Sequence, residues 1–317
     1  MTRASAPGKI ILFGEHAVVY GRPALAVPVT QVHADVEVTA APRRGIWIHA
    51  PDVNLHAELA SLSADHPLGA AIRSVFGPHP RPLSRFRERG GGEGIEINIS
   101  STIPVASGLG SGAAVTVALL RALSSFLLRS LSFDEVNSLA YEIEKLHHGT
   151  PSGIDNTVIT YARPVYFIKG QPIETFTVGA PFTIVIGDTG IRAPTKESVG
   201  DVRKLWEADQ ARWEKVFDEV GEIAKSAREK IERGKKKEEL GALMNANHAL
   251  LQEMTVSSLE LDRLIVAARV AGALGAKLSG GGRGGNMIAL VEKESAPAVA
   301  EALMSAGAKR TIITEVI

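Results

Sequence analysis

A glycine-rich segment, GLGSGAA at residues 108–114, follows a predicted strand and opens a long apolar segment that we predict to be a helix. Glycine lets the main chain approach a ligand closely and adopt dihedral angles that other residues resist. The start of a helix offers N–H groups without helical partners, at the positive end of the helix dipole. These features together are typical of an anion site, most naturally for phosphate. The segment lacks the lysine of the P-loop pattern, and a tight turn packed between strand and helix would use equally small residues.

Two further segments combine glycine with polar residues. Residues 280–285 read GGGRGG between two apolar predicted strands, which is more glycine than a hairpin turn needs. Residues 6–21 read APGKIILFGEHAVVYG, where Lys9 begins an apolar strand and Glu15 and His16 interrupt it. A lysine, a carboxylate and an imidazole near one strand suit a polar substrate. Each of them alone also has a plain structural explanation, as a solvated charge or a core histidine.

Carboxylates that could serve phosphate chemistry occur in the segment EIEKLHHGTPSGIDNTV. Asp155 follows the turn at residues 151–153, and a loop there could hold it to orient or deprotonate a hydroxyl group. Glu144 lies near the end of a predicted helix and could bind Mg²⁺, which uses few protein oxygens besides phosphate. Spacing alone favours a solvated Glu144. The adjacent His147 and His148 point apart on a helix, which argues against a zinc site.

The apolar pattern predicts the elements that position these residues. Strands are predicted at residues 9–13, 24–29, 34–40, 45–48, 95–100, 157–161, 164–168, 182–186, 276–278, 287–291 and 311–316. Helices are predicted at residues 66–76, 111–128, 132–147, 198–233, 237–252, 259–273 and 296–306. Strands and helices mix without the regular alternation of a doubly wound sheet, which favours the α+β class. A boundary near Gly170–Pro181 gives predicted domains at 1–175 and 176–317.

Composition narrows the classes of function. The 317 residues suit about two domains, and the apolar fraction of 45% is ordinary for a globular protein. Lys plus Arg and Asp plus Glu are 35 each, so net charge gives no reason to expect nucleic acid or an anionic membrane as partner. The absence of cysteine excludes disulfides and thiolate sites and fits a cytoplasmic location. We find neither a signal peptide nor an apolar run of roughly 18 residues that could span a membrane. The segment Gly77–Gly94 is predicted to be a surface loop.

In their order along the chain, three segments resemble the three motifs of the GHMP kinase superfamily. They read PGKIILFGEHAVVYG, PVASGLGSGAAV and KLSGGGRGGN. The first of them, together with HGTPSGIDN, looks like the mevalonate kinase branch of that family. Galactokinases usually carry GEHTDY at the first motif, and homoserine kinases usually lack the lysine and the aspartate. The resemblance spans residues 6 to about 291.

The resemblance implies a two-domain GHMP kinase fold, with a ribosomal-S5-like N-terminal domain that binds ATP and a ferredoxin-like C-terminal domain. It implies phosphorylation of the 5-hydroxyl of mevalonate to 5-phosphomevalonate, with ATP and Mg²⁺, in isoprenoid biosynthesis. ATP and mevalonate would be the partners, without nucleic acid or membrane, and a homodimer is the candidate assembly. The alternatives are another GHMP kinase activity, such as phosphomevalonate kinase or mevalonate 3-kinase, and a catalytically silent nucleotide-binding regulator.

The match to the family motifs also implies roles for individual residues. Asp155 is the expected catalytic base, and Lys9 is its expected ion-pair partner. Glu144, eleven residues before Asp155, and Ser111 are the expected Mg²⁺ ligands. The residues expected to line the mevalonate pocket are Glu15, His16, Thr195 and Gly281. The residues expected to wrap the triphosphate are Pro104, Ala106, Gly108, Leu109, Gly110, Ser111, Gly112 and Ala113.

Two positions depart from the usual family pattern. Gly112 stands where relatives usually have the second serine of GLGSSA, so we expect weaker metal binding before any loss of activity. Arg283 stands in GGGRGG where GAGGGG is common. It would add a cation that could serve a phosphate or the substrate carboxylate.

Overall fold

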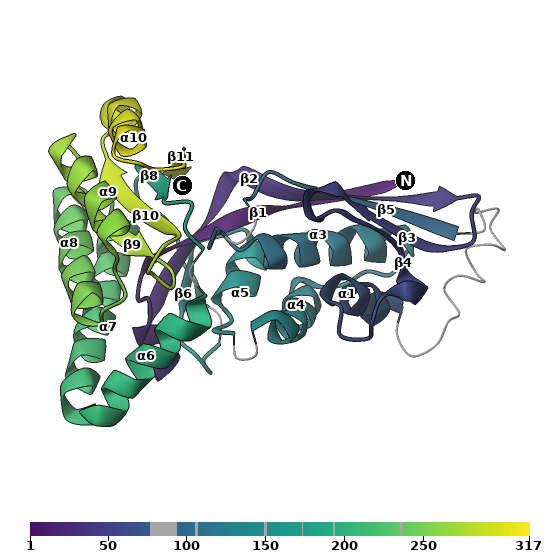
Figure 1. Ribbon diagram of the computed structural model, residues 1–317, viewed down its shortest axis with the longest axis horizontal. Coiled ribbons are helices and arrows are strands. Elements are labelled where there is room, and N and C mark those ends of the chain that lie inside the picture. The colour runs from purple at the N-terminus through teal and green to yellow at the C-terminus, as the bar shows by residue number, and fades with distance from the viewer. Residues whose placement is uncertain (77–93, 105–106, 149–150, 173, 193, 235–236) are drawn as a thin grey trace. The chain divides into compact units, whose positions relative to one another are not determined.

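The computed structural model describes residues 1–317 except 77–93, 105–106, 149–150, 173, 193 and 235–236 (Figure 1). Apart from Gly94, the predicted surface loop lies outside the described residues. The chain forms two compact units. The first comprises Met1–Gly8, Val32–Val105 and Gly110–Ala162, and the second comprises Lys9–Gln31, Ala106–Leu109 and Arg163–Ile317. The boundary between residues 175 and 176 stays a prediction.

The first unit contains strands arranged in the order β4-β3-β5-β2, with β1 paired to β2. They are β1 (Thr2–Phe13), β2 (Ala24–Ala41), β3 (Gly45–Ala50), β4 (Leu55–Glu58) and β5 (Gly94–Ser101). β5 runs parallel to β3 and antiparallel to β2, through residues Ala34–Ala41 of the latter. In β5, Ile95, Ile97 and Ile99 are buried, whereas the residues between them are partly exposed. This alternation is the one predicted for a half-buried strand.

Four helices lie along one face of this sheet (Figure 1). They are α1 (Pro67–Phe76), α3 (Ser111–Phe126), α4 (Phe133–His148) and α5 (Ile154–Tyr161). α3 packs against the other three and against β5, so it is buried on most sides. The small side chains of Ala113, Ala114 and Ala118 let its neighbours come close. The other short elements of this unit are the 3₁₀ turns Pro51–Val53 and Leu59–Ser61.

The predicted strand at residues 157–161 is wrong, because this segment belongs to α5. Its β-branched residues favour a strand when considered alone. Gly153 adopts a left-handed conformation that turns the chain into a helix, and the Thr157 hydroxyl donates to the Gly153 carbonyl at 2.6 Å. Ile154 and Val158 are buried on the side that packs between α3 and α4. Tertiary packing therefore outweighs the local preference.

The second unit is built on a four-stranded antiparallel sheet in the order β11-β8-β10-β9. Its strands are β8 (Phe182–Asp188), β9 (Gly275–Ser279), β10 (Asn286–Val291) and β11 (Arg310–Val316). Its helices are α6 (Thr195–Ala208), α7 (Gln210–Glu232), α8 (Lys237–Glu253), α9 (Leu259–Val270) and α10 (Ala296–Ser305). Chain order and strand order together give the ferredoxin-like arrangement that we predicted.

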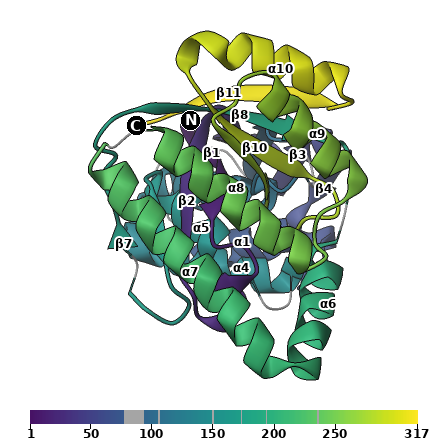
Figure 2. The same cartoon turned by 90° about the vertical axis from the view of Figure 1, so that its left-hand side faces the viewer.

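Helices α8 and α9 cover β9 and β10, and α10 covers β8 and β11 (Figure 2). Phe217, Leu264 and Met287 are among the side chains of the core between helices and sheet. Residues 9–31 add η1 (Ala17–Tyr20), and Ala24–Ala26 of β2 pair with β6 (Val165–Phe167), which pairs in turn with β7 (Glu174–Thr175). A further 3₁₀ turn is η4 (Lys293–Ser295).

The single helix predicted at 198–233 is in fact two helices, α6 and α7. Asp209 separates them, because its side chain accepts a hydrogen bond from the Arg212 N–H at 3.1 Å and caps the start of α7. In the part of the chain that the structure describes, no helix is long and apolar enough to cross a membrane.

Candidate functional site

The glycine motif leads directly into α3, as predicted. Gly108 and Gly110 have φ angles of 82° and 75°, in the left-handed region that favours glycine. Gly110 precedes the first helical residue, Ser111, and no side chain caps the helix there. The N–H groups of the first turn therefore point out of the helix toward a position that suits an anion. Of the residues expected to hold the triphosphate, Ala106 lies outside the described residues.

Glu144 of α4 lies beside the start of α3. Its side chain is 4% exposed. A Cβ atom added at Gly112 would be 3.6 Å from the Glu144 Oε1 atom, so nothing bulky separates the carboxylate from the first turn of α3. The structure thus brings together two of the predicted metal-site positions, the helix start that includes Ser111 and the carboxylate.

Mg²⁺ suits this donor set. Among the described residues, no group of three or more His, Cys, Asp or Glu side chains could hold a metal ion. Mg²⁺ is usually held by one or two carboxylates, with phosphate oxygens and water completing its shell. Glu144, next to a helix start that favours phosphate, offers that kind of partial shell.

Asp155 belongs to the first turn of α5, where the helix dipole favours a negative charge. Neighbouring contacts fix this turn. The Asn156 side chain donates to the Asn137 Oδ1 atom of α4 at 2.6 Å, and both residues are buried. Asp155 itself is half-buried. The predicted base therefore has a rigid support. Lys9 belongs to the other unit, so the pairing of Lys9 with Asp155 stays a prediction.

Lys9 is a buried residue of β1 in the second unit. Its N–H donates to the Leu109 carbonyl at 3.0 Å, which joins the first motif to the glycine segment of the second motif. Asn286, at the start of β10, holds the same segment, because its side-chain amide donates to the Ser107 carbonyl. Sequence reasoning missed Asn286, although it ends the third motif.

The turn that carries Glu15 and His16 has an unusual backbone. Gly14 has a φ angle of 96°, and a Cβ atom there would overlap the Pro23 carbonyl oxygen. His16 also has a positive φ, 60°, which is uncommon for a residue with a side chain. The His16 Nε2 atom lies 3.1 Å from the Gly281 carbonyl oxygen. Since a carbonyl only accepts, His16 carries its proton on Nε2, and Nδ1 is left as an acceptor.

Burial lowers the pKa of His16 to about 4, so the imidazole is neutral near pH 7. Gly281 also contacts Thr195, the first residue of α6. A Cβ atom at Gly281 would lie 2.8 Å from the Thr195 hydroxyl. The structure thus brings His16, Gly281 and Thr195 together in the second unit, as expected for residues of one substrate pocket.

Glu15 is completely buried and forms an ion pair with Lys277 of β9. Burial raises the pKa of Glu15, and the Lys277 ammonium and, more weakly, Lys9 act in the opposite direction. Burial lowers the pKa of Lys277. Sequence reasoning missed Lys277. The available signal was a lysine between Ala276 and Leu278 in an otherwise apolar strand.

Arg283 makes contacts different from those expected of a ligand-binding cation. Its guanidinium donates to the Asp201 carboxylate of α6 at 2.6 Å and to the Thr255 carbonyl at 3.3 Å. Its own N–H donates to the Val256 carbonyl at 2.7 Å. Arg283 therefore fastens the loop 280–285 to its surroundings within the second unit.

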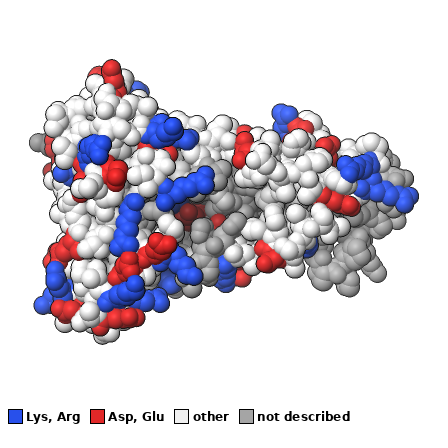
Figure 3. Space-filling view, viewed as in Figure 1, with Lys and Arg blue, Asp and Glu red and all other residues white. Residues whose placement is uncertain are grey.

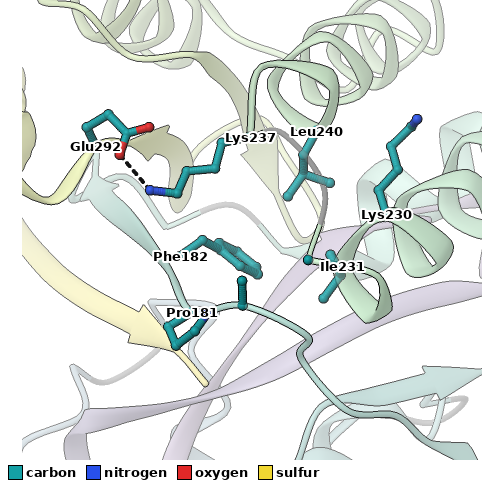
Figure 4. A pocket seen from close by; sticks show the side chains of 9 residues that line it. Pro181, Phe182, Lys230, Ile231, Lys237, Leu240 and Glu292 are labelled. Carbon is teal, nitrogen blue, oxygen red and sulfur yellow. Dashed lines mark hydrogen bonds and ion pairs between the residues drawn. The ribbon is translucent and has the colours of Figure 1, made fainter.

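A cavity of about 340 Å³ in the second unit lies apart from these residues (Figure 4). It is lined by Ala180, Pro181, Phe182, Lys230, Ile231, Gly234, Lys237, Leu240 and Glu292. Lys237 is paired with Glu292, and Lys230 is paired with Glu239. None of the predicted site residues lines this cavity, so it is not our candidate site.

Charged side chains of both signs are interspersed over α6 and α7 on the face shown in Figure 3. Many of them are paired, as Arg212 is with Glu253 and Arg22 is with Glu214 and Asp218. This surface therefore gives no field of one sign that would attract a polyanion.

Comparison with protein families places the two halves of the chain in one class. The model described as "GHMP kinases N terminal domain" matches residues 81–163, and "GHMP kinases C terminal" matches residues 223–309. The fold and the glycine motifs are therefore those of a GHMP kinase, which confirms the predicted superfamily and its two-domain α+β fold.

Comparison with individual proteins shows which branch of the GHMP kinases the chain resembles. The mevalonate kinase of Pyrococcus furiosus is 37% identical over 326 residues, covering 99% of this chain and 95% of the relative. That of Thermococcus gammatolerans is 39% identical over 332 residues, with the same coverage. The crystal structure of L. major mevalonate kinase in complex with R-mevalonate matches with a TM-score of 0.82 and 30% identity, covering 100% of this chain and 96% of that one. The chain belongs to the mevalonate kinase family.

Proposed function

We propose that the protein transfers the γ-phosphoryl group of ATP to the 5-hydroxyl of mevalonate. Relatives named as mevalonate kinases match almost the whole chain, and one related structure is described as a complex with R-mevalonate. The observation that carries the proposal is the approach of the Glu144 carboxylate to the glycine-lined start of α3. That pair suits a metal-bound polyphosphate.

In the proposed reaction, the 5-hydroxyl oxygen attacks the γ-phosphorus, and the bond to the β,γ-bridging oxygen breaks to release ADP. Asp155 accepts the hydroxyl proton, and Lys9 keeps Asp155 ionised and stabilises charge on the transferred group. The N–H groups of the segment from Gly108 to Ala113 hold the triphosphate. Glu144 and the Ser111 hydroxyl would hold Mg²⁺, which neutralises phosphate charge when bound.

The second unit contains the residues that we propose bind mevalonate, the alcohol that receives the phosphoryl group. Neutral His16 has an acceptor at Nδ1, and the Glu15 Oε2 atom is a second buried acceptor; neither has a partner among the described residues. Buried acceptors on two consecutive residues suit the hydroxyl donors of mevalonate. Thr195 and Gly281 complete this group.

A coupled assay of ADP release tests the proposal. Mevalonate, phosphomevalonate, homoserine and galactose are offered with ATP and Mg²⁺, and the product is located by phosphorus–proton NMR correlation. We expect mevalonate to be preferred and the phosphate to be on the 5-oxygen. A 3-phosphate, or a preference for phosphomevalonate, would assign one of the alternative activities. No turnover with any alcohol, despite nucleotide binding, would identify a silent regulator. A homodimer and a cytoplasmic location stay predictions.

Gly112→Ser is expected to lower the Mg²⁺ concentration that gives half-maximal activity by about two- to fivefold. The serine Cβ would fit at 3.6 Å from Glu144, and its hydroxyl would add an oxygen beside the carboxylate. Gly112→Ala is the matched control, because it adds the same Cβ without the oxygen. Mg²⁺ titrations of kcat at saturating ATP measure the effect. If the two variants need the same Mg²⁺ concentration for half-maximal activity, the side chain at residue 112 does not reach the metal.

Arg283→Ala is expected to raise the KM for one of the two substrates, ATP or mevalonate. The increase should be only about two- to fivefold, because the Arg283–Asp201 pair is partly exposed and such pairs contribute little. Asp201→Asn should have the same effect if Arg283 acts by holding the loop. Steady-state kinetics with each substrate varied in turn separates the possibilities. If only Arg283→Ala has an effect, Arg283 contacts a ligand directly, and unchanged kinetics in both variants would exclude either role.

A further inference from the structure

Lys277 lies in the middle of β9 with a side chain that is 0% exposed. Its neighbours Ala276 and Leu278 belong to the apolar core under the helices. Since side chains alternate along a strand, Lys277 and Ser279 point to the opposite face. There the Ser279 hydroxyl donates to the Ile11 carbonyl at 2.8 Å, and the Lys277 ammonium donates to the Glu15 carboxylate and to the Leu278 carbonyl, the latter at 2.6 Å.

A buried ion pair is a weak source of stability. Removing two charges from water is costly, and well-packed apolar residues of similar volume are often as good or better. The Lys277–Glu15 pair, with side chains 0% and 1% exposed, is therefore poorly explained by stability alone. Its place in the fold points to another role.

Two contacts join the same two segments. Lys277 binds Glu15, and four residues later the Gly281 carbonyl accepts from His16. The pair therefore fixes β9 and its loop to a turn in which His16 has a positive φ angle of 60°. A residue in this conformation persists only when its surroundings hold it there. Lys277 holds the turn at Glu15, immediately before the strained residue.

We propose that Lys277 is a positioning residue for the phosphoryl acceptor. It favours the ionised form of Glu15 and holds it in place, and through the turn it positions the Glu15 Oε2 and His16 Nδ1 acceptors for a hydroxyl-bearing substrate. This inference rests on the proposed function of the second unit. It assigns Lys277 no contact with substrate, and it predicts that Lys277 matters for the acceptor alcohol and little for ATP.

The test compares Lys277→Met, Glu15→Gln and the double variant, with Lys293→Met as a control at a lysine that is 75% exposed. We expect Lys277→Met to raise the KM for mevalonate about tenfold or more and to change the KM for ATP less than twofold. The double variant should resemble Glu15→Gln within about twofold, because Lys277 has no role once Glu15 is neutral. Lys293→Met should behave like the wild type.

The pH dependence of kcat/KM for mevalonate is a second test, because a purely structural role of Lys277 would not change it. Without Lys277, the charged group left to act on Glu15 is Lys9 of β1, and burial then favours protonated Glu15. In Lys277→Met, kcat/KM for mevalonate should rise with pH more than in the wild type as Glu15 ionises, and this additional rise should disappear in the double variant. Neutral His16, with Arg283 and Lys277 as the charges acting on it, has a pKa of about 4 and does not titrate near or above neutral pH.

Three outcomes would overturn the inference: equal losses for ATP and mevalonate, a pH profile of Lys277→Met parallel to that of the wild type, or a double variant tenfold worse than Glu15→Gln. The last comparison does not use Lys277→Met, so it holds even if that variant does not fold. The double variant leaves no lone buried charge, and in Glu15→Gln burial lowers the pKa of the unpaired Lys277, which favours its neutral form. Wild-type turnover of mevalonate is measured first, so failure of the proposed function is recognised separately. If another alcohol is the better substrate, the same ratios are measured with it.

Discussion

Asp155→Asn is expected to lower kcat by about a thousandfold, in the range typical for loss of a general base. Asparagine has nearly the shape of aspartate but does not accept the hydroxyl proton. The Asn156–Asn137 hydrogen bond and the Thr157–Gly153 hydrogen bond are unaffected, so α5 should keep its place. Binding of ATP should change less than about twofold, because the triphosphate is assigned to α3 and not to α5.

The measurement combines single-turnover kinetics with titration of a non-hydrolysable ATP analogue and a thermal unfolding curve. Asp134→Asn is the control, since Asp134 of α4 accepts a hydrogen bond from the Tyr161 hydroxyl of α5 and has no assigned role in catalysis. It should keep turnover close to the wild type. A kcat for Asp155→Asn within tenfold of the wild type, in a protein that binds the analogue normally, would remove Asp155 from the role of base.

Local patterns predicted the elements that matter most for nucleotide binding. Apolar periodicity placed a helix from Ser111, and the observed α3 begins at that residue. The glycines before it were assigned to close backbone approach, and Gly108 and Gly110 have the positive φ angles that require glycine. These features depend on neighbours in sequence, which explains why the sequence alone was sufficient.

Other features depend on residues that are distant in sequence. Glu15 and Lys277 are 262 positions apart, and Ser107 and Asn286 are 179 positions apart. No pattern along the chain shows that either pair meets. The prediction of a strand at residues 157–161 was wrong for a related reason, because the helical state of this segment depends on packing against α3 and α4. The break at Asp209 was missed because a capping aspartate in a charged helix resembles any other surface charge.

Loss of Glu144, the proposed metal-binding carboxylate, should have the second largest effect. Glu144→Gln is expected to raise the Mg²⁺ concentration needed for half-maximal activity by a hundredfold or thereabouts, on the scale at which even outer-shell partners of a metal cost about 10- to 100-fold. Glutamine keeps the size of the side chain but removes the charge that Mg²⁺ prefers among its oxygen ligands.

Glu142→Gln is the matched control, since Glu142 lies on the same helix, its side chain is 63% exposed and it pairs with Lys145. Residues two apart on a helix do not share a face, so this control changes the charge of α4 without changing the assigned site. Mg²⁺ titrations at fixed ATP should separate the two variants by more than tenfold. Direct Mn²⁺ binding in the presence of an ATP analogue, followed by electron paramagnetic resonance, gives a readout besides turnover. If Glu144→Gln binds Mn²⁺ as tightly as Glu142→Gln does, the carboxylate does not hold the metal, and its position beside Gly112 must serve packing alone.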